Sequence, residues 1–362
     1  MSTWDALAQL PVAIEGYGLE GLEYEFAPEW TRTCTLIRLH GGGEEGVGED
    51  VVYDALDHIA FQDAGQVLDL TGPSTLGELS ELLDVLDLFP GSPPVRDYSR
   101  LYRRWAFESA ALDLALRQAG RSLAQAVGRD PQPLTYVVSI RLAAPGASGP
   151  ETAERLYGVL ERYPHTRFKL DPTQNWSDAL IAELVATGAV DSVDLKGHYS
   201  GTPVDVATDP GLYRRVAEAF PNAWLEDPDL SDPAAAQALE PYRDRITWDA
   251  PIHSVADIEA LPFPPRTVNV KPSRLGGLES LCSAYDYCER EGIGAYGGGQ
   301  TELGVGRDHI QYLAAVFHPH TPNDVAPREF NLPGAPPPGL PESPMEVPVA
   351  DSGFRFSRED ER

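Results

Sequence analysis

From residue 131 onward, short apolar runs alternate with segments of helical periodicity. The pattern predicts strands at 133–143, 166–171, 190–196, 223–228, 245–251, 266–272 and 293–299, with one more near 321–326. Such alternation indicates parallel strands joined by crossover helices, and eight of them favour a modified (β/α)8 TIM barrel in the α/β class. An open doubly wound sheet is the alternative. It is disfavoured because no Gly-x-Gly-x-x-Gly motif follows the first strand.

The first 130 residues follow a different pattern. Residues 33–41 and 47–55 read as the two strands of a hairpin around a glycine-rich turn, and 74–89 and 101–120 read as amphipathic helices. We therefore expect an N-terminal α+β capping domain at 1–130 and the barrel at 131–330. Residues 331–348 contain seven prolines and cannot form a helix. We expect the segment 331–362 to pack back on the cap.

Composition narrows the possible partners. The chain of 362 residues has 56 Asp and Glu against 28 Lys and Arg, a net charge of −28. This balance excludes an ordinary nucleic-acid binder and argues against docking on anionic membranes. No run of 18 apolar residues predicts a membrane span. Three cysteines without a Cys-x-x-Cys pair and an N-terminus without signal-peptide features lead us to expect a cytoplasmic protein.

Charged residues recur once per unit at the carboxyl ends of the predicted barrel strands, where barrel enzymes carry their active sites. They are Lys169, Asp194, Glu226, Asp249 and Lys271, followed by the glycine run 297–299. Three carboxylates confined in one mouth cannot all stay ionised without a cation. A hard divalent ion such as Mg²⁺ is the natural solution. A lysine beside that ion could act as a base, and the ion could stabilise the dianion formed when an α-proton leaves.

The same segments, in this order, resemble the enolase superfamily in its mandelate racemase and muconate lactonizing branches. The resemblance covers most of the chain. The segments that carry it are GGGEEGVGEDVVY (41–53), RWAFESAALDLALRQAGRSLAQAVG (104–128), RFK (167–169), WLEDP (224–228), TWDAP (247–251), NVKPSRLGGL (269–278) and GGGQTELGVG (297–306).

The resemblance implies specific roles for these residues. Asp194, Glu226 and Asp249 would bind Mg²⁺, with Mn²⁺ as a possible substitute, and Lys169 and Lys271 would be the acid/base pair. Candidate substrate-binding residues are Arg167, Asp171, Lys196, Gly298, Gly299 and Glu302. Cap loops within 14–30 would set specificity, and the subunits would form a homo-oligomer. FKLDPTQNW (168–176) also resembles a metal-binding strand, but its Asp171 shares a strand with Lys169, so the spacing favours Asp194.

The implied reaction is removal of the proton α to a metal-bound carboxylate of a small molecule. Racemisation or epimerisation could follow, or cycloisomerisation or β-elimination. The Lys/Lys pair resembles the muconate lactonizing subgroup, whereas Arg167 and Lys196 depart from the family pattern, which often has Lys and Asn there. The alternatives are a non-catalytic ligand-binding relative and another metal-assisted barrel enzyme, such as a lyase, hydrolase or aldolase.

Overall fold

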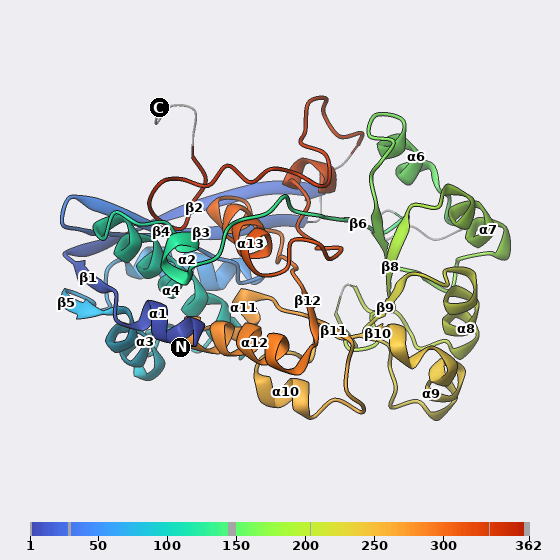
Figure 1. Cartoon of the computed structure of the whole chain (residues 1–362), viewed down its shortest axis with the longest axis horizontal. Coiled ribbons are helices and arrows are strands. Elements are labelled where there is room, and N and C mark those ends of the chain that lie inside the picture. Colours follow the sequence, from blue (N-terminus) through green and yellow to red (C-terminus); the bar gives the residue numbers. More distant parts are fainter. Residues whose placement is uncertain (1, 28–29, 144–149, 203, 333, 358–362) are drawn as a thin grey trace.

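Parallel strands form a closed barrel in the computed structural model, which describes residues 2–27, 30–143, 150–202, 204–332 and 334–357 (Figure 1). Five strands pair in sequence order, and β11 and β12 pair with each other. Their bounds are β6 Val138–Ile140, β7 Phe168–Leu170, β8 Val190–Asp194, β9 Trp224–Glu226, β10 Ile246–Thr247, β11 Thr267–Asn269 and β12 Gly294–Tyr296. This architecture confirms the predicted fold class.

Single backbone hydrogen bonds close the barrel where the regular pairing stops. The Asn269 amide donates to the Trp248 carbonyl (2.9 Å) and so joins β11 to β10. On the other side, the Asp324 amide donates to Gly297 and the Val137 amide donates to Asn323, each at 2.8 Å. Residues 323–324 therefore occupy the position of the eighth barrel strand, within the predicted range 321–326.

Helices follow the strands around the outside of the barrel. They are α6 Glu154–Leu160, α7 Asp178–Thr187, α8 Pro210–Ala219, α9 Pro233–Leu239, α10 Val255–Glu259, α12 Leu278–Glu291 and α13 Val305–Phe317, with α11 Pro272–Leu275 as a short additional turn. Several begin at the residue that the sequence suggests: Ser177, Asp209, Asp232 and Ser254 each accept a backbone N–H of the first turn. No helix in the described part of the chain is both long and apolar enough to cross a membrane.

The cap differs in detail from the predicted hairpin. A three-stranded antiparallel sheet is formed by β2 Gly16–Ala27, β3 Trp30–Gly41 and β4 Glu44–Asp50. β2 was missed because most of its residues are only partly buried and it is rich in Gly and Glu. The predicted second strand, 47–55, is too long, since β4 ends at Asp50 and α2 begins at Ala55. The remaining cap elements are α1 Thr3–Ala8, β1 Pro11–Ile14, α2 Ala55–Ala64, β5 Gly72–Thr75, α3 Leu76–Val85, α4 Ser99–Gln118 and α5 Leu123–Val127.

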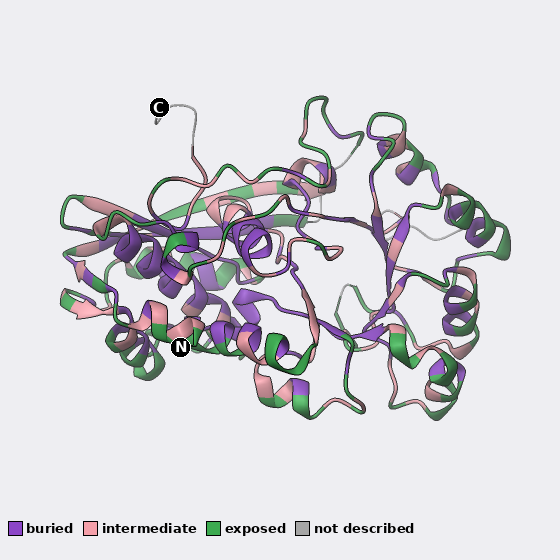
Figure 2. Ribbon diagram, in the orientation of Figure 1, coloured by how far each residue is buried: buried purple, intermediate pink, exposed green. Residues whose placement is uncertain are grey.

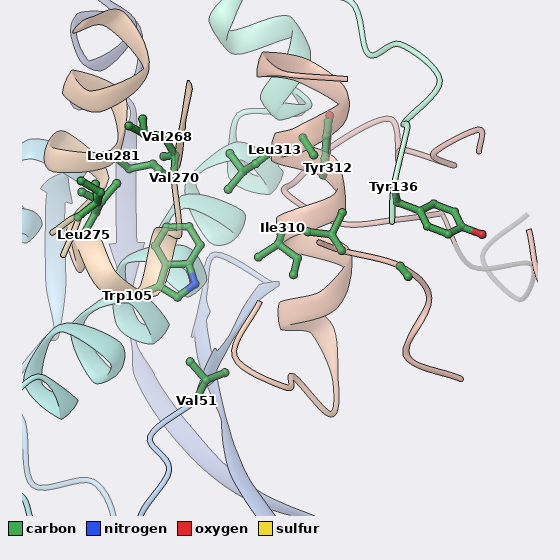
Figure 3. Close-up of a cluster of buried hydrophobic side chains, with 14 of the residues drawn as sticks. Val51, Trp105, Tyr136, Val268, Val270, Leu275, Leu281, Ile310, Tyr312 and Leu313 are labelled. Carbon is green, nitrogen blue, oxygen red and sulfur yellow. The ribbon is translucent and has the colours of Figure 1, made fainter. Parts of the chain in front are cut away.

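Cap and barrel share one hydrophobic core (Figures 2 and 3). In Figure 3, Trp105 of the cap lies between side chains of the barrel strand β11 and of helix α13, and Val51 of the cap belongs to the same buried cluster. The C-terminal segment joins the same core: Phe354 is fully buried and stacks on His309 of α13 at 4.1 Å, while the Arg355 guanidinium pairs with Asp113 of α4. The orientation of the cap over the barrel is therefore fixed by packing.

Two glycines allow α4 to lie directly on β4. A Cβ added to Gly46 would lie 2.1 Å from the Ala110 carbonyl oxygen, and one added to Gly48 would lie 2.0 Å from that of Ala106. No side chain larger than hydrogen fits between these backbones, which explains the alternating glycines of the motif 41–53.

We predict that Gly48→Ala destabilises the protein by at least about 2 kcal/mol, because the new methyl group must push α4 away from β4. Gly158→Ala is the matched control: Gly158 lies in α6 with nothing within 4 Å of the added Cβ. That change should cost nothing and could add up to about 1 kcal/mol. Urea unfolding measures both. Equal stability of the two variants would contradict the packing argument.

A buried histidine, His318, contacts Asn323 in the eighth strand position of the barrel. Asn323 donates its amide hydrogens to the carbonyls of Thr135, His318 and Thr321, so its Oδ1 is an acceptor. This oxygen receives the Gly297 amide (2.6 Å) and lies 2.6 Å from His318 Nδ1, which must therefore carry a proton. Burial lowers the pKa of His318 from 6.5 to about 4.

We predict an acid-dependent loss of stability at this site. His318 is neutral in the folded chain and takes up a proton on unfolding, so its contribution is complete above pH 6.5 and is lost as the pH falls toward 4. The loss by pH 4 is roughly 3 kcal/mol. Urea unfolding at pH 7 and pH 4.5 measures it. His318→Gln, which can hydrogen-bond but does not titrate there, should lose less stability on acidification than the unmodified chain. An identical loss in both would refute this role.

Candidate active site

Three of the predicted residues meet at the carboxyl ends of neighbouring strands. Lys169 lies in β7, Asp194 ends β8 and Glu226 ends β9, and Asp194 and Glu226 are direct partners in the register of the two strands. All three side chains are buried. The Lys169 ammonium hydrogen-bonds Glu226 and lies 3.1 Å from Asp194 Oδ2. It also lies 3.4 Å from Asp324 in the eighth strand position. Asp324 was not among the predicted site residues.

A second group of charged side chains, centred on Asp249, lies one strand further around the barrel. Asp249 follows β10 and accepts hydrogen bonds from Lys271 Nζ at 2.7 Å and Arg274 Nη1 at 2.9 Å. The hydroxyl of Tyr199 donates to Asp249 Oδ2 at 3.1 Å and accepts from Arg274. Arg274 was missed because it follows Lys271 on α11, beyond the strand end. Tyr199 follows β8 and carries no charge, so the recurrence of charged residues at strand ends does not indicate it; its side chain reaches across to the fifth strand.

Two of the predicted acids form a close group with Asp227, the residue that follows Glu226. Among the described residues, ligand oxygens of Asp194, Glu226 and Asp227 lie within 4.8 Å of one another and could hold a metal ion. Asp227, however, accepts the amides of Asp249 (2.8 Å) and Ala250 (2.9 Å), and its backbone has φ +48°. Asp227 thus holds the end of β10 in place, and Asp249 itself lies outside this group.

Burial and neighbouring charges shift the pKa values of these groups in opposite directions. Burial would lower the pKa of Lys169, but Glu226 and Asp194 outweigh it and raise that pKa well above its usual range. For Asp249, burial favours the neutral acid, but Arg274 and Lys271 hold its pKa below the usual range. Burial raises the pKa of Glu226 well above its ordinary value, and Lys169 only partly opposes this.

One oxygen in the group lacks a counterpart. Glu226 Oε2 is buried and has no hydrogen-bond partner among the described residues. An unpaired buried carboxylate oxygen is costly unless a cation or proton reaches it. Together with the neighbouring oxygen of Asp194, this atom fits the requirements of a hard divalent cation, which prefers carboxylate oxygens.

Lys196 and Asp171 lie beside the same group. The Lys196 ammonium hydrogen-bonds Asp194 Oδ2 and lies 3.8 Å from Asp171 Oδ1. Asp171 is also 3.7 Å from Arg141 Nε. The Lys196 side chain therefore lies against the two acids, and the lysine that faces Asp171 is Lys196. The full sequence contains three lysines among 28 basic residues, and all three stand in this site.

The other predicted substrate-binding residues have different surroundings. Arg167 pairs with Asp191 at the start of β8 and donates to the Gly188 carbonyl, so it lies at the opposite end of the strands from the site. The placement of Arg167 at the mouth was therefore wrong: residue 167 precedes β7, two positions before Lys169, and a strand places its two ends on opposite faces of the barrel. Glu302 is buried, pairs with Arg307 at 3.0 Å and borders the cap.

The glycines after β12 provide space. A Cβ on Gly298 would lie 2.5 Å from Lys271 Cε, and one on Gly299 would lie 2.5 Å from Glu302 Oε2. A side chain at position 298 would therefore displace Lys271. The glycines are needed for this close approach.

The cap fixes the loop that follows these glycines. The guanidinium of Arg32 in β3 is fully buried and donates to the carbonyls of Gln300 (3.1 Å) and Thr301 (3.2 Å). Glu49 in β4 accepts the amides of Leu303, Gly304 and Gly306 at 2.6–2.9 Å, at the start of α13. The cap thus holds one wall of the site through two buried charges that the sequence analysis did not identify.

Comparisons with known proteins agree with this architecture. An o-succinylbenzoate synthase from Geobacillus stearothermophilus is 28% identical over 232 residues, covering 61% of this chain and 58% of that protein. An N-succinylamino acid racemase from Thermus thermophilus is 26% identical over 322 residues, covering 84% and 81%. A solved structure of an enolase superfamily member from Listeria innocua superposes with a TM-score of 0.66 at 18% identity, covering 97% and 96%. The chain spans less than two thirds of the first relative's length.

The chain is thus similar in fold to a solved member of the enolase superfamily and similar in sequence to these two enzymes, which agrees with the resemblance in the sequence. At the finer level, residues 130–332, more than half of the chain, match the C-terminal domain model of the family described as a domain of unknown function, DUF8230, and residues 5–126 match its N-terminal model. The chain belongs to the DUF8230 family.

Proposed function

We propose that the protein is a Mg²⁺-dependent enzyme that removes the proton α to the carboxylate of a small organic acid. The observation that carries the proposal is the placement of the lysines. Lys169 and Lys271 stand on β7 and after β11, with the acids of β8, β9 and β10 between them. Two ammonium groups can therefore approach one bound substrate from opposite sides.

The choice of lysine is itself informative. Arginine stays protonated in proteins, whereas lysine can lose its proton when a nearby positive charge or burial lowers its pKa. A chain that uses arginine at nearly all its basic positions keeps lysine at these sites, where a group must be able to give up and regain a proton. This pattern supports acid/base roles for Lys169 and Lys271.

Asp194 and Glu226 would hold the divalent ion, while Asp227 remains bound to the backbone amides of the β10 loop. Asp249 lies outside this group and is paired with Lys271 and Arg274, so it would become the third ligand only by giving up one of these partners. A bound Mg²⁺ supplies Lewis-acid stabilisation of the substrate carboxylate and of the negative charge that develops on it. Lys169 or Lys271 then takes the α-proton at Nζ. The opposite lysine returns a proton to the other face or, remaining cationic, stabilises the enolate. Arg274 and Tyr199 keep the Asp249 carboxylate oriented.

The relatives suggest which acids to test first. The two named here are a synthase of o-succinylbenzoate and a racemase of N-succinylamino acids. We therefore propose N-acylated α-amino acids as the first substrates to try. Racemisation is the reaction for which two opposed lysines are sufficient, and cycloisomerisation and elimination are the alternatives.

The test is exchange of solvent deuterium into a panel of α-carboxylic acids, including N-succinylamino acids, with Mg²⁺ present. We expect wash-in at the α-carbon, followed by NMR, and a loss of at least about 100-fold in Lys169→Ala and in Lys271→Ala, because each change removes an acid/base group. A racemase should keep exchange of one enantiomer in each single variant. Arg167→Met, at the other end of the barrel, is the control and should exchange normally.

Two outcomes would contradict the proposal. Exchange of both enantiomers at the unmodified rate in either single variant, or any exchange in the Lys169→Ala/Lys271→Ala double variant, would show that the bases are wrong. Absence of exchange across the panel, with Mg²⁺ bound, would favour the non-catalytic relative that binds a ligand on the same scaffold. A Schiff-base aldolase would instead be trapped by borohydride with a carbonyl substrate, and the resulting adduct would identify the lysine.

A further inference from the structure

We infer that Lys196 competes with the divalent cation for the Asp194 carboxylate, and that metal binding moves its ammonium group from Asp194 to Asp171. This inference rests on the metal site of the proposed function, and goes beyond it by assigning a role to a residue which that reaction does not use. It follows from the contacts that Asp194 and Asp171 make with Lys196.

Lys196 donates to both oxygens of the Asp194 carboxylate. Its backbone amide donates to Asp194 Oδ1 at 3.2 Å, and its ammonium group donates to Oδ2 of the same carboxylate. Oδ2 also receives Lys169 at 3.1 Å. A divalent cation cannot coordinate this carboxylate closely while two ammonium groups share Oδ2, because like charges at such distances repel strongly in a buried site. One ammonium group has to leave.

The backbone of Lys196 is fixed, so only its side chain can make this change. Residue 196 has φ +55°, a left-handed conformation that is unfavourable for lysine. The next residue, Gly197, donates its amide to the Asp227 carbonyl at 2.8 Å, and a Cβ there would lie 2.2 Å from the Asp229 nitrogen. The strained backbone therefore keeps the ammonium group at the mouth of the site.

A second position for the ammonium group lies within reach. Asp171 Oδ1 is buried, has no hydrogen-bond partner among the described residues and lies 3.8 Å from Lys196 Nζ. A small rotation would replace one ion pair with another. A compact ammonium group can alternate between two carboxylates in this way, whereas the planar guanidinium of arginine could not do so without rebuilding the site. This accounts for the third lysine of an arginine-rich chain.

Mn²⁺ binding, followed by the EPR signal of the free ion, tests the inference independently of turnover. Lys196→Met keeps the length of the side chain and removes its charge, so we expect Mn²⁺ to bind at least about tenfold more tightly than to the unmodified protein. Arg167→Met removes a cation from the far end of the barrel and should leave the affinity within about twofold. Circular dichroism and thermal melting confirm folding, and Lys196→Gln is the second variant.

Asp171→Asn separates a switch from simple repulsion. In the unmodified background it should weaken Mn²⁺ binding, because the displaced ammonium group loses its partner. In the Lys196→Met background the same change should have a clearly smaller effect, which gives a measurable coupling between the two positions. Equal effects in both backgrounds would overturn the movement to Asp171.

Lysine-labelled protein gives a direct view of the movement. With ¹³C-lysine, the chain yields three ε-methylene signals, each assigned by one substitution. Titration with Mg²⁺ should shift the Lys196 signal, and Asp171→Asn should change its end point. Unchanged or weaker Mn²⁺ affinity in both Lys196 variants, with normal binding by the unmodified chain, overturns this inference and leaves the proposed function intact. Absence of metal binding in every form overturns both.

Discussion

The constraint on which the site depends is charge neutrality in a buried space. Parallel strands bring Asp194, Glu226 and Asp249 to one end of the barrel, where no single carboxylate could remain ionised alone. Positive charges of the protein itself, on Lys169, Lys196, Lys271 and Arg274, pair with these acids. Only Glu226 Oε2 is left unmatched among these oxygens. The acids can therefore be packed without unfolding the barrel and still attract a cation.

The cap extends this arrangement to the wall of the site. Arg32 and Glu49 are buried charges whose partners are mainly backbone groups of residues 300–306. Such contacts are strong because the charged group is desolvated and fully hydrogen-bonded. Position 298 has to be glycine, because Lys271 occupies the space where a side chain at this position would lie. The cap thus holds the loop that follows directly after the glycine beside Lys271.

The alternating pattern was sufficient to predict the barrel because each strand is short, apolar and followed by an amphipathic helix. It located Lys169, Asp194 and Glu226 at one mouth, since residue spacing determines which strand ends meet. It failed at β2, where neither face is fully buried and the apolar signal is weak. It also misplaced Arg167, because a motif match does not show at which end of a strand a side chain lies. Arg274 and Tyr199 depend on how loops fold back, which periodicity does not encode.

Lys196 shows most clearly where sequence reasoning stops. The sequence places it two residues after Asp194 and on the same face, which is correct, but an ordinary strand would separate the two side chains along its axis. The left-handed backbone at residue 196 ends the strand and brings amide and ammonium group onto one carboxylate. Such a conformation is costly for lysine and persists only where surrounding contacts enforce it, as Gly197 and Asp227 do here. The strain is local, and it lies between two acids that would otherwise both be available to a metal ion.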